Sequence, residues 1–161
     1  MTQKDLKYHA TYLKMASEWS SLSCCKRKKV GALIVKEGTI ISDGFNGTPR
    51  GFLNDCEDGE GKTHWYVLHA EANAILKVAK SSQSTDGSTL YVTYSPCKEC
   101  SKLIIQAGIK QVFYSEEYRD TSGLRILREA GIAVIKLTPW NERTFSLNSI
   151  CSRIQELYLC F

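Results

Sequence analysis

Two short segments of the sequence carry side chains that could together bind a metal ion and move protons. His69 is followed two residues later by Glu71, and Cys97 is followed three residues later by Cys100. One imidazole and two thiolates can hold a zinc ion and leave its fourth position open for water. The Glu71 carboxylate could then carry protons to and from that water without binding the metal. The spacing therefore predicts hydrolysis at a zinc centre.

Each half of this pattern, taken alone, has a simpler explanation. A lone Cys-x-x-Cys is found in redox pairs and in structural zinc sites, and His-x-Glu is common by chance. A structural zinc site would need a fourth protein ligand, for which Cys56 and His64 are candidates. The two halves in this order, with Pro96 before the first cysteine, form the signature of zinc-dependent nucleobase deaminases. A structural site also has no need of Glu71, so we expect a catalytic site.

The elements that must position these side chains can be read from periodicity and from turn residues. We expect helices over 5–20, 69–81, 97–107, 121–130 and 145–160, strands over 30–35, 39–45, 90–94, 111–114 and 132–137, and a loop over 46–64. His69 opens one helix, and the two cysteines lie three apart at the start of the next, on one face. The alternation predicts one α/β domain over 1–161, a three-layer α/β/α sandwich with a mixed sheet of about five strands and a C-terminal extension over 139–161.

The bulk composition limits the classes of protein to consider. The chain has 161 residues, 43% hydrophobic and 24% charged, with a net charge of +4. No apolar run approaches the roughly 20 residues of a membrane helix, and we expect no signal peptide. The seven cysteines are an odd number, which argues against a disulfide framework and favours a cytoplasmic location. We expect neither a nucleic-acid nor a membrane partner.

Several further segments resemble deoxycytidylate (dCMP) deaminases, especially those of phages. The segments are 29–35, 44–55, 69–75, 90–97 and 106–110, within a resemblance that covers roughly 5–137. The stretch Gly-Phe-Asn-Gly-Thr-Pro narrows the resemblance from the wider cytidine deaminase-like superfamily to dCMP deaminases. Those enzymes more usually have Tyr at the position of Phe45. The resemblance implies the cytidine deaminase-like sandwich and conversion of dCMP and water to dUMP and ammonia. That reaction feeds dTTP synthesis, in the host cytoplasm if a phage encodes the chain.

The resemblance also implies which residues contact the substrate. Asn46 matches the asparagine that contacts the sugar, and Ala70 and Tyr118 match further contacts. Arg119, beside Tyr118, could bind the 5′-phosphate because a guanidinium suits phosphate geometry. Both polar residues have a simpler explanation as well. Asn46 could be a turn residue, since Asn-Gly favours turns, and Arg119 a solvated loop side chain.

Members of the family are typically homohexamers, activated by dCTP and inhibited by dTTP. The resemblance places the regulatory nucleotide at Lys29, Gly44, Asn46, Gly47, Arg50 and Gly51. The alternative is that the positive charges here only form a solvated face.

Some phage members carry a second zinc, for which the matching residues are Cys24 or Cys25, Cys56 and His64. Val67 stands where those members have a glutamate ligand. We therefore expect one zinc per chain, with a second only if another ligand substitutes for that glutamate. The alternative is that these thiols pack in the core, where free cysteine is common.

Two other functions remain open. The alternative enzyme is a nucleic-acid deaminase of the tRNA adenosine type, but such enzymes usually need a wider basic surface and match the 44–55 segment less well. A free-nucleoside deaminase is less favoured for the same reason. From another class, the chain could be a non-catalytic, zinc-stabilised binding module. The presence of Glu71 argues against that module.

Overall fold

The computed structural model describes residues 1–137, so the helix expected over 145–160 lies outside the described residues. The helices and strands are α1 (Gln3–Ser20), β1 (Gly31–Lys36), β2 (Thr39–Phe45), α2 (Ala70–Val78), β3 (Thr89–Tyr94), α3 (Lys98–Gln106), β4 (Gln111–Glu116), α4 (Ser122–Glu129) and β5 (Ala133–Lys136). Within residues 1–137 the elements are those expected from the sequence, with ends that differ by at most three residues.

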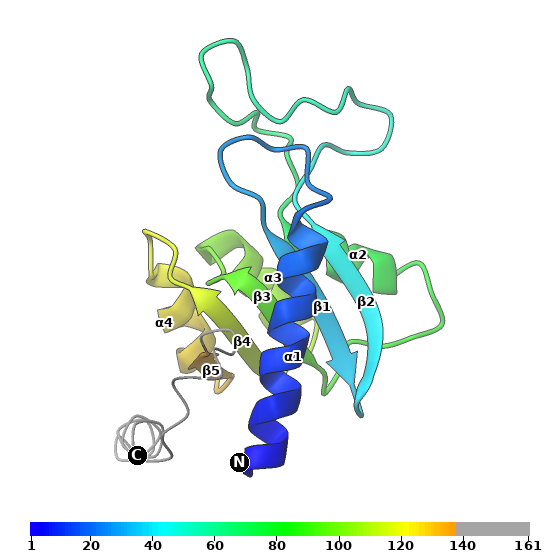
Figure 1. The fold of residues 1–161 in the computed structure, drawn as a ribbon, viewed down its shortest axis with the longest axis vertical. Helices are drawn as coiled ribbons and strands as arrows, with labels where there is room; N and C mark the ends of the chain where they lie inside the picture. Colours follow the sequence, from blue (N-terminus) through cyan, green and yellow to red (C-terminus); the bar gives the residue numbers. More distant parts are fainter. Residues whose placement is uncertain (138–161) are drawn as a thin grey trace.

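The five strands form one mixed sheet in the order β2-β1-β3-β4-β5. β1 pairs antiparallel with β2 and β3, whereas β3, β4 and β5 run parallel. α1 lies across one face of the sheet, and α2, α3 and α4 lie behind the other (Figure 1). A separate apolar cluster fills each interface, one beneath α1 and one between the sheet and the other three helices. The three-layer sandwich expected from the sequence is confirmed.

α1 is fixed by its first turn and by one apolar face. The Thr2 side chain accepts a hydrogen bond from the Asp5 backbone N–H, and Asp5 accepts one from the Thr2 backbone, which together form a capping box. Its buried residues recur every three to four positions, as expected of a helix that packs one face on a sheet: Leu6, Ala10, Leu13 and Ala16.

One edge of the sheet gathers segments that are far apart in the chain. β2 and β3 are both antiparallel to β1, so their carboxyl ends lie beside the start of β1, and the carboxyl end of β4 lies next to that of β3. The loops that leave these ends are therefore neighbours. The loop between β2 and α2 rises above this edge as the extended segment at the top of Figure 1. Ligands of open α/β sheets bind at such carboxyl ends.

Gly44, in β2, allows α2 to lie directly on the sheet. A Cβ atom at this position would stand 2.2 Å from the carbonyl oxygen of Ala70 and 2.7 Å from the backbone nitrogen of Ala74. No side chain fits between these backbones. Gly44 therefore sets the position of the helix that begins after His69.

None of the helices within residues 1–137 is both long and apolar enough to span a membrane.

Candidate active site

The three expected metal ligands are held by the N-terminal ends of α2 and α3. His69 and Cys97 are the N-cap residues of these helices, and both have extended backbone conformations. Cys100 lies in the first turn of α3. Because the two helices pack against the same face of the sheet, their N-termini meet at the sheet edge described above.

The three side chains are close enough to share one ion. Nδ1 of His69 lies 3.5 Å from Sγ of Cys97 and 3.4 Å from Sγ of Cys100. Tetrahedral zinc with its usual bond lengths would separate nitrogen and sulfur ligands by about 3.6 Å. The donor set and its spacing therefore fit a zinc ion with three protein ligands.

The two thiols have opposite proton affinities. A hydrogen bond from Cys100 lowers the pKa of Cys97 to about 3, and the neighbouring Cys97 thiolate raises the pKa of Cys100. The same thiolate raises the pKa of His69 through a hydrogen bond. The two sulfur atoms and the imidazole compete for protons because they lie so close together. A metal cation would take the place of these protons, so the arrangement suits a metal ion.

Glu71 lies in the first turn of α2 but is not one of the three grouped ligands. Its side chain is buried, with 4% of the residue exposed. Burial raises the pKa of its carboxyl above the ordinary value. A carboxylate with a raised pKa accepts a proton more readily than that of an ordinary glutamate, which suits general acid–base work.

A pocket of about 410 Å³ opens onto this group. Its volume is in the range expected for a small-molecule site. All four residues expected to contact the substrate line it, namely Asn46, Ala70, Tyr118 and Arg119. The structure therefore brings these four together with His69, Glu71 and Cys97.

Asn46 is braced by the loop that precedes β1. Its Oδ1 accepts a hydrogen bond from the Val30 N–H, and its Nδ2 donates one to the carbonyl oxygen of Lys28, each at 2.8 Å. An amide has one further N–H and one further lone pair. Asn46 therefore both fixes this loop and retains hydrogen-bonding capacity toward the pocket.

Most of the residues expected at a regulatory nucleotide site lie outside the pocket. Apart from Asn46, none of them lines the pocket: Lys29, Gly44, Gly47, Arg50 and Gly51. Lys29, Arg50 and Gly51 are exposed, and Gly47 pairs with Leu68 across the base of the long loop. Gly44 lies beneath α2, so its contacts are with protein backbone.

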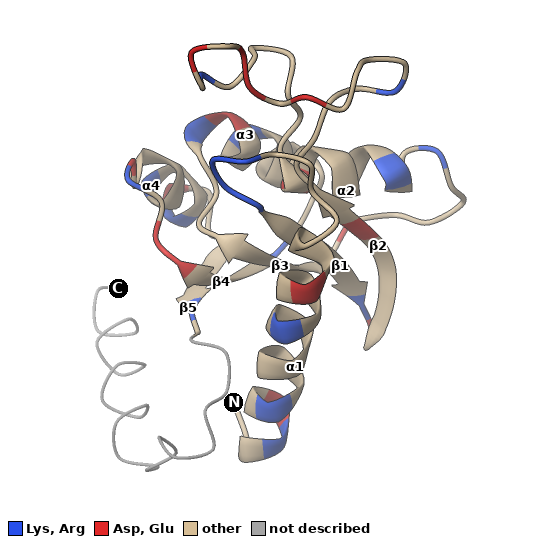
Figure 2. Cartoon of the chain, turned by 45° about the horizontal axis from the view of Figure 1, so that its top comes forward, with Lys and Arg blue, Asp and Glu red and all other residues tan. Residues whose placement is uncertain are grey.

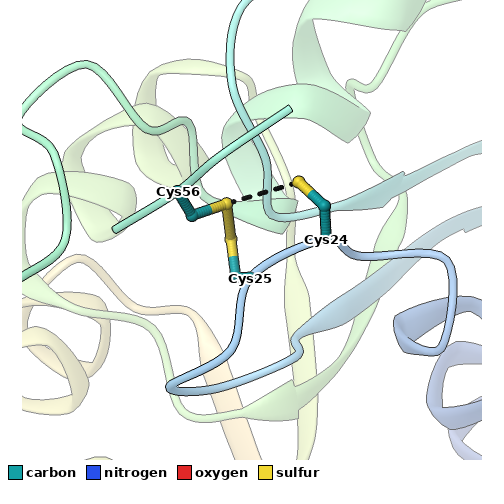
Figure 3. A group of neighbouring side chains, drawn as sticks. All are labelled: Cys24, Cys25 and Cys56. Carbon is teal, nitrogen blue, oxygen red and sulfur yellow. Dashed lines mark hydrogen bonds between the residues drawn. A yellow bond between two sulfur atoms is a disulfide. The ribbon is translucent and has the colours of Figure 1, made fainter. Parts of the chain in front are cut away.

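The cysteines outside the metal group correct one expectation. Cys25 and Cys56 form a disulfide, and Sγ of Cys24 lies 3.5 Å from Sγ of Cys56 (Figure 3). The odd cysteine count argued against disulfides, but the long loop folds back over the loop before β1 and brings the two Cα atoms to 5.0 Å. The three sulfur atoms lie close together without His64, but the disulfide leaves only Cys24 of the three with a free thiol to bind a metal.

Two further residues shape the pocket and were not identified from the sequence. Ser95 accepts a hydrogen bond from the Tyr118 backbone N–H at 2.8 Å and thereby positions Tyr118. Glu57, with 5% exposed, accepts hydrogen bonds from the backbone N–H groups of Lys26 and Arg27. Ser95 directly precedes Pro96 in the cysteine motif, which could have indicated it. Glu57 had no sequence pattern to mark it.

Residues 4–116 match the family described as the cytidine and deoxycytidylate deaminase zinc-binding region. The chain belongs to this family. This deaminase-family chain is 36% identical to the deoxycytidylate deaminase of Enterobacteria phage T4, over 82% of its own length and 91% of the phage protein. It is 38% identical to that of Saccharomyces cerevisiae over 76% of its length, but spans only 42% of the yeast protein. The phage resemblance inferred from the sequence is confirmed.

Solved structures agree with this assignment. The dCMP deaminase of the cyanophage S-TIM5, solved in complex with dCMP and dUMP, is 50% identical, with a TM-score of 0.80 over 85% of this chain and 99% of that one. A tRNA:A34 deaminase is 20% identical with a TM-score of 0.53, which shows a shared fold and nothing about substrate.

Proposed function

We propose that the chain converts dCMP and water to dUMP and ammonia, and that it does so as a zinc enzyme. The observation that carries this proposal is the group of His69, Cys97 and Cys100, which meets the pocket through His69 and Cys97 beside the buried Glu71. The likeness to the cyanophage enzyme supports dCMP as the substrate. The dUMP formed would feed dTTP synthesis, in the cytoplasm.

A zinc ion held by His69, Cys97 and Cys100 would lower the pKa of a water molecule in its open position. Glu71 takes one proton from the water as the water oxygen bonds to C4 of the pyrimidine, and delivers that proton to N3. Glu71 then moves the second proton to the amino group. The C4–N4 bond breaks and ammonia leaves, so both protons of the water are accounted for.

The other pocket residues hold the nucleotide. In this proposal Asn46 uses its remaining N–H and lone pair on the sugar hydroxyl, and Tyr118, fixed by Ser95, contacts the substrate beside it. Ala70, at the start of α2, offers backbone to the pyrimidine, and Arg119 binds the 5′-phosphate. Support for Arg119 comes from its place in the pocket wall and from the match between guanidinium and phosphate.

Ammonia release tests the reaction and its substrate class together. We expect the zinc-loaded protein to release ammonia from dCMP and to yield dUMP, with little release from cytidine and none from adenosine-containing RNA. Zinc is measured in the same samples, and we propose one ion per chain. Deamination of the RNA in preference to dCMP would favour the tRNA-type alternative, and a zinc-loaded protein inactive on all three would favour a binding module.

We further propose a homohexamer that dCTP activates and dTTP inhibits, with the nucleotide near Lys29, Arg50 and Gly51. These exposed residues lie outside the pocket, so a regulator could bind without displacing substrate. At subsaturating dCMP, added dCTP should raise the rate and added dTTP should lower it, because a regulator shifts the population of the competent state. Equal rates with and without dCTP would contradict the proposed regulation.

A further inference from the structure

The loop between α1 and β1 carries four consecutive cationic residues, 26–29. Figure 2 shows this loop as a blue run across the open edge of the sheet, below the long loop. The four side chains are not equivalent. Arg27 and Lys28 line the pocket, whereas Lys26 and Lys29 do not.

Lys28 lines the pocket with an ammonium group that is available to a ligand. Its Nζ lies 3.9 Å from the centroid of the Tyr94 ring, which holds it by a cation–π contact. Within residues 1–137 no carboxylate or hydrogen-bond acceptor pairs with this ammonium group. Arg27, in contrast, donates from Nη1 to the Thr63 hydroxyl at 3.2 Å.

The backbone around Lys28 is held on both sides. Asn46 bonds the carbonyl of Lys28 and the N–H of Val30, and Glu57 accepts the N–H groups of Lys26 and Arg27. Asn46 lies at the start of the long loop that follows β2, and Glu57 lies within that loop. These hydrogen bonds place the Lys28 backbone beside the pocket and do not involve its ammonium group.

A second cation flanks the same strand end. Lys28 precedes β1 and Arg119 follows β4, and these strands lie on either side of β3, which ends at Tyr94. The guanidinium of Arg119 lies 5.8 Å from the Tyr118 ring centroid. The pocket also contains Glu57 and Glu71, so an anionic ligand needs cations to offset these carboxyl groups.

We propose that Lys28 is a specificity residue that binds the 5′-phosphate of the nucleotide and makes the pocket select a nucleoside monophosphate over the nucleoside. This inference rests on the proposed function, since it deepens the account of the same pocket. A charge-assisted hydrogen bond to phosphate gives such selectivity, because a nucleoside lacks the partner and gains nothing from Lys28.

Binding of dUMP and of deoxyuridine to the zinc-loaded protein, by titration calorimetry, tests the role without turnover. Lys28→Met and Lys28→Gln should weaken dUMP binding about 10- to 100-fold, the usual loss for a hydrogen bond to a charged group. Binding of deoxyuridine should be unchanged. The ratio of kcat/KM for dCMP to that for deoxycytidine should fall by the same factor, and Lys28→Arg should restore most of it. Lys26→Met, which removes one charge two residues away and outside the pocket, is the matched control.

Equal losses for dUMP and deoxyuridine would mean that Lys28 only supports the loop, and no loss for dUMP would mean that the phosphate lies elsewhere; either result overturns the inference. A wild-type protein that binds dUMP no more tightly than deoxyuridine also overturns it. A wild-type protein that prefers dUMP through Lys28 but releases no ammonia from dCMP contradicts the proposed function alone.

Discussion

Replacing Glu71 by glutamine is expected to remove nearly all turnover of dCMP while zinc binding is retained. The amide has the same size and fills the same buried space, but it cannot accept and release a proton. General acid–base catalysis contributes about 10²- to 10⁴-fold to rates, so we expect kcat to fall by about three orders of magnitude, or about 4 kcal/mol. Steady-state kinetics with metal analysis on the same preparations measures both quantities.

Glu99→Gln is the matched control for this substitution. Glu99 lies next to Cys100 in the first turn of α3, but its carboxylate is exposed and pairs with Lys102 at 2.6 Å. Its loss should leave turnover unchanged. Near-normal turnover in zinc-loaded Glu71→Gln would exclude Glu71 as the proton carrier. Loss of zinc together with turnover would instead place Glu71 among the metal ligands.

The secondary structure could be predicted because its determinants are local. The strands are short runs of β-branched and aromatic residues, and Pro96 and Gly108 bracket the α3 helix that carries Cys100. His69 and Glu71, and likewise Cys97 and Cys100, are near neighbours in the chain. Their relative placement follows from one helix turn each, so the proposed metal group and the proposed proton carrier could be predicted from the sequence.

The remainder of the pocket depends on contacts between distant segments. Glu57 bonds the backbone of Lys26 and Arg27 because the loop before β1 packs under the long loop after β2, and periodicity does not show such packing. Cys25 and Cys56 are separated by 31 residues, and nothing in their spacing indicated a bond. Arguments from cysteine count concern the cellular compartment, and they do not determine which sulfur atoms the fold places together.

Gly44 illustrates how a motif residue can have two explanations. The family resemblance places it in the regulatory nucleotide loop, and the structure places its Cα against the backbone of α2. Both can hold, but they predict different consequences of adding a side chain. A backbone contact cannot be relieved by rotating a side chain, so the packing role predicts a loss of stability.

Gly44→Ala is therefore expected to destabilise the fold and to disturb the metal group. The added Cβ would stand 2.2 Å from the Ala70 carbonyl oxygen, so α2 must move away from β2 and carry His69 with it. Overpacking of this kind costs about 3 kcal/mol, which corresponds to a fall in Tm of about 10 °C. Thermal unfolding followed by circular dichroism measures the first effect, and zinc content after dialysis measures the second.

Gly59→Ala is the control, because no atom lies within 4 Å of a Cβ built there. Its Tm should equal that of the wild type. If Gly44→Ala also keeps the wild-type Tm but no longer responds to dCTP, the nucleotide role is correct and the close approach of α2 is not limiting. If Tm and zinc retention fall together, the glycine of this motif is required because α2, and with it the first metal ligand, rests on its backbone.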